Sequence, residues 1–344
     1  MNLPPVITNE EQLEDVMTEP PEALIQLMKK LDGDIMILGI AGKMGITLGR
    51  EALRAMQLAG VKRCVLGVSR FSDAAARGKL EKLGIKTIPC DLLDRYAVQK
   101  LPQAENIIFM AGKKFGTSDS EAATWAMNTV VPCNVAHHFS KSRIVAFSTG
   151  NVYPFTPVHS GGATEALTPA PIGDYAQSCL GRERVFSYYG GTNNIPIAII
   201  RLFYAVDLRY GVLYDIAQKI WQGETIDLTM GNANVIWQGD ANTHALLALE
   251  YCSIPANIIN STGPEILSIR YAAEVLGGFL KKKPVFHGTE APTALLANVA
   301  KAMRLFGYPR VSLGQMLEWT AHWVQSGGKS LNKATHFEVR DGKF

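Results

Sequence analysis

The chain has 344 residues and a formal net charge of +3, and 47% of its residues are hydrophobic while 19% are charged. This length and composition allow a sizeable buried core, so disorder is not expected. The apolar runs are too short to span a bilayer, and no long basic run marks a nucleic-acid or membrane surface. We therefore expect a soluble globular protein whose partner is a small molecule, with no nucleic acid and no membrane.

The first residues and the cysteines bear on the compartment. Acidic residues stand near the start, where an export or transit peptide would carry basic ones. The five cysteines form no CxxC pair, which is typical of buried thiols in a reducing compartment. We expect a cytoplasmic protein. The seven histidines show no ligand spacing, so no metal site is expected.

Alternating strands and helices dominate the chain after an N-terminal helical extension at 1–33, in which 22–31 has helical spacing. We expect strands at 34–40, 63–69, 85–90, 106–111, 143–149 and 196–203. We expect helices at 44–60, 72–83, 119–140 and 174–189. This alternation predicts an α/β fold, a doubly wound parallel sheet of the Rossmann type over 34–200. A smaller C-terminal lobe and tail would occupy 201–344, with amphipathic segments at 292–306 and 312–326.

The stretch "GIAGKMG" joins the first expected strand to the first expected helix. The spacing of Gly39, Gly42 and Gly45 allows a tight turn, a close approach to a pyrophosphate, and helix N–H groups aimed at the anion. Lys43 and Met44 lie in the same loop and are counted with the cofactor-binding residues. The alternative is that these glycines only let strand and helix pack closely. Their place after the first strand favours a dinucleotide site.

The end of the second strand bears on the choice of cofactor. Ser69 and Arg70 stand where an acid would bind the ribose 2′-hydroxyl of NAD, and a guanidinium pairs well with a phosphate. NADP(H) is therefore favoured, with NAD(H) possible, unless Arg70 only faces solvent. After the third strand, Asp91 and Leu92 are expected at the adenine, although Asp91 is equally suited to cap a helix.

With these elements in order, the sequence resembles the extended short-chain dehydrogenase/reductases, specifically the NAD-dependent epimerase/dehydratase family, over about 35–330. The resemblance rests on the glycine loop, Asp91-Leu92, "MAGKKFG" after the fourth strand, Asn128, "STGNVYP" at 148–154, and Tyr175. It implies that the cofactor also contacts Ala111, Gly112, Asn128 and Phe203. The implied activity is that of an NAD(P)-dependent oxidoreductase, epimerase or dehydratase.

The resemblance also implies a catalytic set, with one departure. Thr149, with Ser148 beside it, would hold the substrate oxygen, and Tyr175 would transfer the proton. The family places a lysine four residues after this tyrosine, where this chain has Cys179. A nearby ammonium lowers the pKa of a tyrosine, so we expect Lys113 or Lys114 to supply the charge. The alternatives are that both are solvated loop lysines and that Tyr175 is an ordinary buried tyrosine.

Two further departures concern the substrate. The segment 231–240 lacks the arginine that clamps the diphosphate in relatives acting on nucleotide sugars, and Tyr204 stands where relatives have an asparagine. We expect a smaller hydroxyl- or keto-bearing substrate, similar to a sugar or sugar acid, near Tyr204 and Trp237. The competing hypothesis, favoured by Cys179, is a non-catalytic NAD(P)-binding sensor or scaffold.

The resemblance finally implies a homodimer. The helices at 119–140 and 174–189 resemble those that form a two-fold four-helix interface in this superfamily. Its expected core is Val130, Val131, Val135, Val185 and Phe186. The polar and aromatic tail at 335–344 is compatible with an arm docked across a partner or with a loose end.

Overall fold

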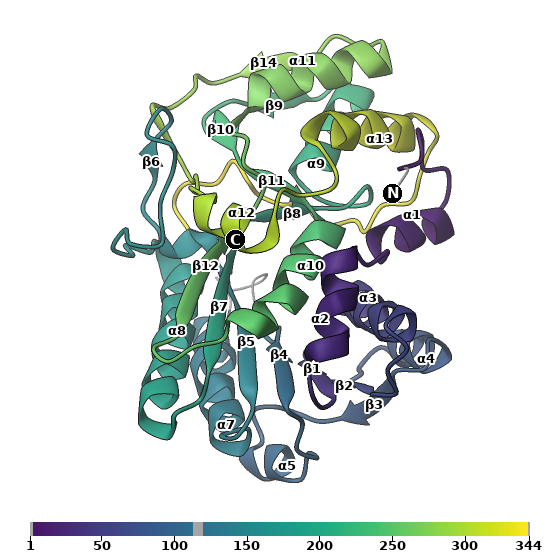
Figure 1. Ribbon diagram of the computed structural model, residues 1–344. Helices are drawn as coiled ribbons and strands as arrows, with labels where there is room; N and C mark the ends of the chain where they lie inside the picture. Colours follow the sequence, from purple (N-terminus) through teal and green to yellow (C-terminus); the bar gives the residue numbers. More distant parts are fainter. Residues whose placement is uncertain (1–2, 113–119, 343–344) are drawn as a thin grey trace.

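A seven-stranded parallel sheet forms the centre of the molecule in the computed structural model, which describes residues 3–112 and 120–342. The strand order is β12-β7-β5-β4-β1-β2-β3 (Figure 1). The strands are β1 (Ile35–Leu38), β2 (Val65–Ser69), β3 (Lys86–Pro89), β4 (Asn106–Phe109), β5 (Arg143–Thr149), β7 (Ile197–Leu202) and β12 (Asn257–Ser261). The six expected strands and the Rossmann architecture are confirmed.

Burial follows the position of each strand in the sheet. All four residues of the central β1 are buried, and its side chains alternate between the two faces. Ile35 and Ile37 pack on one face, and Met36 and Leu38 pack on the other. At the edge, β3 exposes Lys86. A continuous apolar run therefore marks a central strand, because it must be apolar on both sides.

Helices cover both faces of the sheet (Figure 1). One core includes side chains of α2 (Glu22–Lys30), α3 (Gly45–Leu58), α4 (Ala74–Lys82), α10 (Gln238–Leu247) and α12 (Ala300–Phe306). The core of the other face includes α5 (Arg95–Gln99), α7 (Val131–His138) and α8 (Gly173–Asn193). α6 (Glu121–Trp125) and a π-helical segment (Ala126–Val130) lead into α7. The four expected helices are confirmed over their described residues, as is the helix expected at 22–31.

The second lobe packs three helices around a tryptophan-rich core. These helices are α9 (Val212–Gln222), α11 (Ile269–Leu280) and α13 (Leu313–Gln325). Short strand pairs complete the lobe and its border with the sheet: β6 (Thr156–Pro157) with β15 (Thr293–Ala294), β8 (Tyr204–Val206) with β11 (Val235–Trp237), β9 (Thr225–Asp227) with β14 (Val285–His287), and β10 (Asn232–Ala233) with β13 (Leu267–Ser268). Three short 3₁₀ and π segments are Ala126–Val130, Gly150–Val152 and Ala248–Tyr251.

Two features of the structure differ from the expected division into a Rossmann domain up to residue 200 and a C-terminal lobe after it. β12 and α10 come from later in the chain, yet they extend the sheet and cover its face. The amphipathic segment at 292–306 is only partly helical, because 293–294 pair with β6 and only α12 is a helix. The Asn298 side chain accepts a hydrogen bond from Ala300 N at 3.0 Å, which marks the start of that helix.

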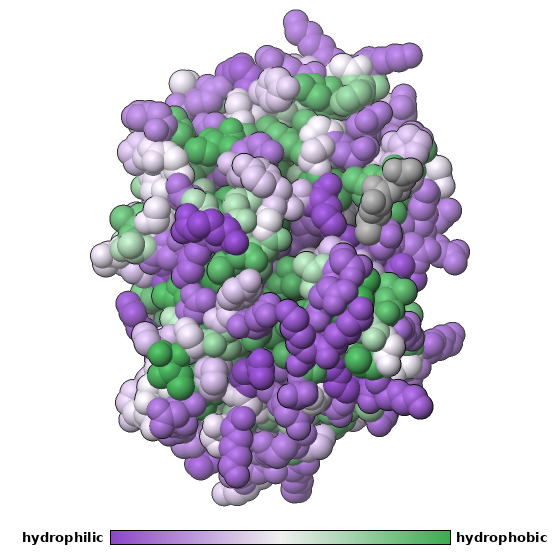
Figure 2. All heavy atoms as spheres, viewed as in Figure 1, coloured by the Kyte–Doolittle hydropathy of each residue, from purple (hydrophilic) through white to green (hydrophobic). Residues whose placement is uncertain are grey.

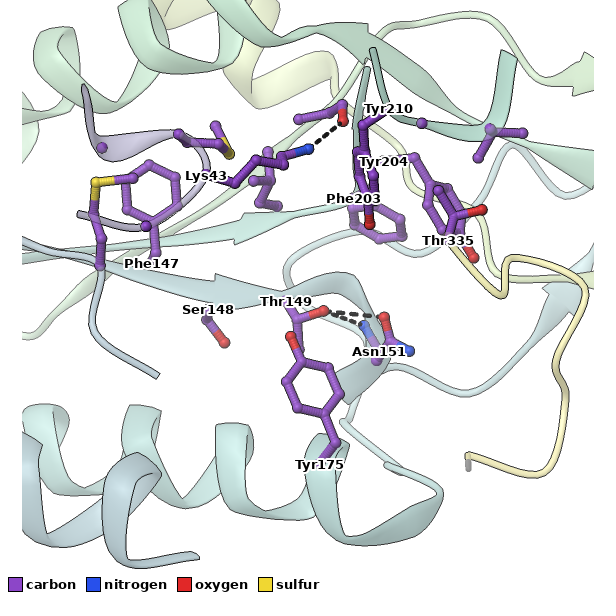
Figure 3. Close-up of a pocket in the computed structure, with 18 of the residues that line it drawn as sticks. Lys43, Phe147, Ser148, Thr149, Asn151, Tyr175, Phe203, Tyr204, Tyr210 and Thr335 are labelled. Carbon is purple, nitrogen blue, oxygen red and sulfur yellow. Dashed lines mark hydrogen bonds between the residues drawn. The ribbon is translucent and has the colours of Figure 1, made fainter. Parts of the chain in front are cut away.

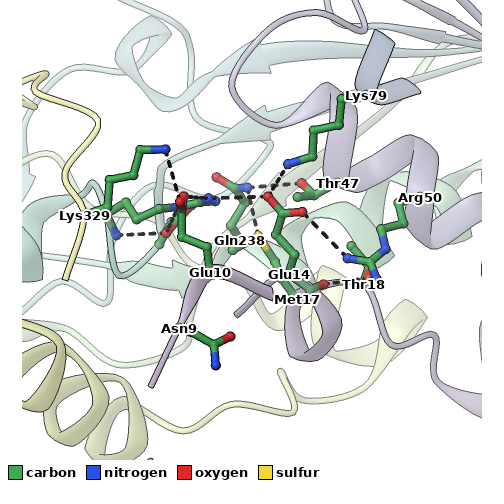
Figure 4. Close-up of polar contacts among 12 residues, drawn as sticks. Asn9, Glu10, Glu14, Met17, Thr18, Thr47, Arg50, Lys79, Gln238 and Lys329 are labelled. Atoms are coloured by element: carbon green, nitrogen blue, oxygen red, sulfur yellow. Dashed lines mark hydrogen bonds and ion pairs between the residues drawn. The ribbon is translucent and has the colours of Figure 1, made fainter. Parts of the chain in front are cut away.

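The N-terminal extension ties the two parts of the molecule together. Besides α2 it contains α1 (Glu10–Met17), whose Leu13 and Met17 join the core of the second lobe. In Figure 4, basic side chains from segments far apart in the sequence contact Glu10 and Glu14. Glu14 pairs with Lys79 and Arg50, and both acids pair with Arg209.

Hydrophilic side chains cover most of the face seen in Figure 2, with smaller hydrophobic patches between them. Among the described residues, no helix is both long enough and apolar enough to cross a membrane.

Candidate active site

A cavity of about 290 Å³ lies at the carboxyl ends of the central strands (Figure 3). Its walls come from the glycine loop, the end of β5, the start of α8 and the second lobe. It is lined by Gly39, Gly42, Lys43, Met44, Gly45, Met110, Phe147, Ser148, Thr149, Asn151, Tyr175, Leu202, Phe203, Tyr204, Ala205, Tyr210, Gly211, Val212, Leu295 and Thr335. Ten of the residues expected at the site therefore line one cavity.

The glycine loop fits a bound pyrophosphate. Gly39 has φ +92°, and a Cβ there would lie 2.8 Å from Ala111 N. A Cβ at Gly45, the first residue of α3, would lie 2.3 Å from Ile40 O. Backbone therefore approaches closely at the start of a helix, where N–H groups favour an anion.

A second cavity of about 280 Å³ shares Gly39 and Gly42 with the first. The expected cofactor residues that line it are Ser69, Arg70, Asp91, Leu92, Ala111 and Gly112. Arg70 is exposed, and no described carboxylate forms an ion pair with it. Asp91 Oδ1 accepts a hydrogen bond from Leu93 N at 3.0 Å, so its side chain supports the local turn as well as facing the cavity.

Thr149 and Tyr175 meet at the floor of the first cavity. Thr149 ends β5 and Tyr175 lies in the first turn of α8, and Figure 3 shows the Tyr175 hydroxyl directed at Thr149. Burial and, after it, the neighbouring Cys179 raise the pKa of Tyr175 well above its ordinary value, whereas Arg182 and a hydrogen bond with Thr149 lower it. Asn151, which the sequence analysis missed, accepts a hydrogen bond from Thr149 Oγ1 at 3.0 Å.

Ser148 lines the same cavity, but its hydroxyl serves a buried network. It donates to Glu183 at 2.5 Å, and Glu183 pairs with Arg201 at 2.6 Å. Arg201 donates to the Tyr153 hydroxyl at 2.6 Å, which donates to Asn260 at 2.9 Å. Ser148 therefore fixes the end of β5 onto α8.

Cys179 and Asn128 lie behind the cavity, and neither lines it. Both are fully buried, and Asn128 Nδ2 donates to Ser178 Oγ at 2.9 Å. Asn128 Oδ1 accepts a hydrogen bond from Arg182, a buried residue that the sequence analysis did not single out.

The far wall of the cavity carries aromatic residues and one cation. Lys43 Nζ lies 3.7 Å from the centre of the Tyr210 ring and donates to Ala205 O at 3.4 Å. Burial raises the pKa of Tyr210 to about 12, so this phenol stays neutral. The described part of the C-terminal tail packs on its own chain, which is neither an arm across a partner nor a loose end: Thr335 lines the cavity and its hydroxyl donates to Asp215 at 2.5 Å.

Trp237 does not line the cavity, so the expectation that it approaches the substrate is corrected. Its side chain is fully buried in the second lobe, where its ring packs edge-on against Trp319 with centroids 5.5 Å apart. Trp237 occupies an apolar core position, since all three residues of β11, Trp237 included, are buried. Lys113 and Lys114 lie outside the described residues. Within 3–112 and 120–342, no cluster of His, Cys, Asp or Glu side chains is arranged to hold a metal ion.

A doubly wound sheet with a glycine loop and a Thr–Tyr pair at its carboxyl edge defines a nicotinamide-dependent protein of the short-chain dehydrogenase/reductase type. Residues 35–211 match the NAD dependent epimerase/dehydratase family, and the chain belongs to that family. No curated protein sequence matches the chain.

Solved structures share the fold over most of their length. The UDP-glucuronic acid 4-epimerase from Bacillus cereus in complex with NAD has a TM-score of 0.70 at 21% identity, covering 85% of this chain and 96% of that one. The UDP-glucose 4-epimerase from Thermotoga maritima, with UDP-glucose, has a TM-score of 0.70 at 16% identity, with coverages of 86% and 99%. Pal from Bacillus thuringiensis has a TM-score of 0.70 at 20% identity, with coverages of 85% and 99%.

Proposed function

We propose that the chain is an NAD(P)-dependent oxidoreductase or epimerase that acts on a small hydroxyl- or keto-bearing substrate similar to a sugar or sugar acid. The observation that carries the proposal is one cavity that holds the glycine loop together with Thr149 and Tyr175. A non-catalytic sensor would need only the cofactor site. The presence of Tyr175, the expected proton-transfer residue, in the same cavity as the glycine loop supports an enzyme.

The residues of the cavity have separate roles in the proposed reaction. Thr149 and Tyr175 hold the substrate oxygen by hydrogen bonds, with Asn151 fixing the Thr149 hydroxyl. When the hydroxyl is oxidised, its proton passes to the Tyr175 phenolate, and it returns on reduction. A bound nicotinamide supplies the hydride acceptor or donor. Phe203 and residues of the second lobe line the cavity around the expected position of the reacting oxygen.

The cofactor would lie across the two cavities that share Gly39 and Gly42. The glycine loop would bind the pyrophosphate, and Asp91 and Leu92 would lie at the adenine. We propose a preference for NADP(H), supported by Ser69 and by an exposed Arg70 with no carboxylate partner among the described residues. The similar Bacillus cereus structure contains NAD, so NAD(H) is the alternative.

The charge of the cavity supports a small, singly anionic or neutral substrate. Lys43 is the one charged residue among the described residues that line it. Two arginines nearby are held in buried ion pairs, Arg201 with Glu183 and Arg209 with Asp207. A diphosphate normally requires charge-assisted hydrogen bonds from several cations, which these walls do not offer.

The second candidate is a nucleotide sugar, because similar structures are UDP-sugar epimerases. Arg340 is the cation that would serve it, since it lines a small adjoining cavity with Tyr204 and Leu295. Its guanidinium already donates to Thr293 O at 2.8 Å and packs over Phe155. A diphosphate would have to displace these contacts, which favours the smaller substrate.

The test is a substrate screen with both nicotinamide cofactors. Small sugars, sugar acids and their keto forms are compared with UDP-glucose and UDP-glucuronic acid, following nicotinamide absorbance and, for epimerisation, product NMR. We expect turnover of a small substrate and a loss on the order of 10² or more in Tyr175→Phe. Turnover of UDP-sugars alone would favour the second candidate. No turnover, with cofactor affinity unchanged in Tyr175→Phe, would favour a sensor.

A further inference from the structure

Arg182 lies two turns after Tyr175 on the same side of α8. The residues are seven positions apart, which places both side chains toward the sheet. Side chains on a helix lean toward its N-terminus, so the long Arg182 side chain extends back over the turn that contains Cys179. Only 6% of Arg182 is exposed.

The guanidinium contacts residues of both cavities. Arg182 Nη1 donates to Phe147 O at 2.8 Å, and Phe147 lines the first cavity. A Cβ on Gly112, which lines the second cavity, would lie 2.4 Å from Arg182 Nη2. The charge therefore stands directly behind the junction of the two cavities.

Among the described residues, no carboxylate forms an ion pair with this guanidinium. Its hydrogen-bond acceptors among the described residues are the Phe147 carbonyl and the Asn128 amide, both neutral. The adjacent Glu183 is paired with Arg201 instead. Arg182 Nε has no hydrogen-bond partner among the described residues. A buried cation with no carboxylate partner is costly for stability, so a guanidinium in this state among the described residues, placed at a cavity, is a candidate functional group.

Position 179 explains how the guanidinium reaches this place. Asn128 Nδ2 lies 3.8 Å from Cys179 Sγ, and its Oδ1 accepts the Arg182 hydrogen bond, so thiol and guanidinium share one neighbour. A lysine at 179 would compete for this space and place a second positive charge there. The short thiol leaves the space to Arg182.

We propose that Arg182 is a positioning residue of this site, whose buried guanidinium takes the place of the ammonium absent at position 179 and favours the anionic form of Tyr175. The inference rests on the proposed function, because the phenolate matters only if Tyr175 transfers a proton. It agrees with the electrostatics: burial raises the pKa of Tyr175 and Arg182 opposes that rise.

The variants of the test separate the effect of the positive charge of Arg182 from the effect of its packing. Arg182→Met removes the charge, Arg182→Lys keeps it, and Arg182→Met with Cys179→Lys returns it to position 179. Arg184→Met, at an exposed position of the same helix, is the matched control. Lys113→Met with Lys114→Met tests the competing lysines. Circular dichroism and thermal melts verify folding of each variant.

Three readouts are taken on the full chain. The first is the tyrosinate absorbance that disappears in Tyr175→Phe, titrated against pH with and without NADP⁺. The second is the pH profile of kcat/KM on the screened substrate, and the third is NADPH and NADH affinity by fluorescence. We expect Arg182→Met to move the Tyr175 titration up by about one pH unit or more. Arg182→Lys and the double variant should move it back, and Arg184→Met should leave it unchanged.

The outcomes separate the two proposals. A Tyr175 titration that is the same in the parent and in Arg182→Met, or out of reach in both, overturns the role of Arg182. The role of Arg182 is also overturned if the Tyr175 titration moves in the double variant Lys113→Met, Lys114→Met but not in Arg182→Met. If Arg182→Met fails to fold, Arg182→Gln takes its place, because it removes the charge and keeps a hydrogen-bond donor: a raised Tyr175 titration supports the proposal and an unchanged one overturns it. Failure of the parent to bind either cofactor contradicts the proposed function instead.

Discussion

Ser69 and Arg70 are the side chains on which our proposed cofactor preference rests. Ser69 ends β2 and Arg70 follows it, and both line the second cavity, where we expect a ribose 2′-substituent to lie. A guanidinium that is exposed and has no described carboxylate partner is ready to pair with a phosphate dianion. The same side chain would form only a weaker hydrogen bond with an uncharged 2′-hydroxyl.

We therefore predict that NADPH binds more tightly than NADH, and that Arg70→Ala reduces the difference by about tenfold or more. The reason is the loss of a charge-assisted hydrogen bond worth about 1.5–3 kcal/mol. Fluorescence titration with each cofactor measures it. Arg77→Ala is the control, since Arg77 is paired with Glu81 away from the cavity. Tighter binding of NADH by the unmodified chain would contradict the prediction.

At the level of residues, the sequence predicts what depends on short local motifs. Gly39 is revealed by its spacing to Gly42 and Gly45, whereas Thr149 and Tyr175 are revealed by short motifs that resemble those of the family. Tyr210 and Thr335 reach the cavity only because the second lobe and tail fold back onto the sheet. Arg182 could have been found from its spacing to Tyr175, but its burial is a property of the packed structure.

The contact between α3 and α10 contains a buried carboxyl group. Glu51 Oε1 accepts a hydrogen bond from Thr243 Oγ1, and no described residue bonds Glu51 Oε2. Burial raises the pKa of Glu51 to about 8, although Thr243 and nearby arginines oppose that rise. The carboxyl group is therefore protonated in the folded protein at neutral pH, between two helices that cover the sheet.

This pKa makes stability depend on pH. In the unfolded chain Glu51 ionises near its ordinary value of 4.5, whereas in the folded protein it stays protonated until about 8. The unfolded state alone loses the proton in this window, so the contribution of Glu51 to the free energy of unfolding decreases as pH rises from about 4.5 to 8 and is constant above.

We predict that Glu51→Gln removes this dependence and stabilises the protein at pH 8 by about 1–3 kcal/mol, because each pH unit in the window corresponds to about 1.4 kcal/mol. Glutamine keeps an acceptor for Thr243. Urea unfolding at several pH values gives the measurement, and Glu11→Gln at an exposed position of α1 is the control. An equal pH slope in the parent and in Glu51→Gln would show that Glu51 ionises normally.

At the level of elements, periodicity predicts the sheet because its central strands are continuous apolar runs. It fails for β12 and α10, which belong to the sheet through contacts made late in the chain. The amphipathic pattern also begins before α12. Leu295 and Leu296 are buried, but they directly follow β15 and lie outside the helix. Apolar content in that segment therefore reflects burial without helical structure.

The whole molecule is held together by its two ends. α1 brings Glu10 to Lys329 of the tail and to Arg209 of the second lobe (Figure 4). Further along the tail, Phe337 is buried, and a Cβ on Gly173 at the start of α8 would lie 2.5 Å from Gly342 O. Both ends thus fix the second lobe over the sheet and, through Thr335, complete the cavity wall.

The expected dimer interface requires a correction at this scale. Val131, Val135 and Phe186 are fully buried within the protomer, where they pack on the sheet. They cannot form the core of an interface, because the helix face that carries them is already covered. The exposed apolar side chains on these helices are Val130 and Tyr188, 46% and 64% exposed.

A homodimer through these helices stays our prediction, with Val130 and Tyr188 at its centre. We expect light scattering to give twice the mass of the 37.5 kDa chain at micromolar concentration. Tyr188→Glu should weaken the dimer by about tenfold or more, since a charge replaces an aromatic anchor in a desolvated contact. Tyr308→Glu is the matched control, because Tyr308 is 76% exposed and lies outside these helices. A parent chain that stays monomeric contradicts the prediction, and a dimer broken by Tyr308→Glu but not by Tyr188→Glu would place the interface on another face.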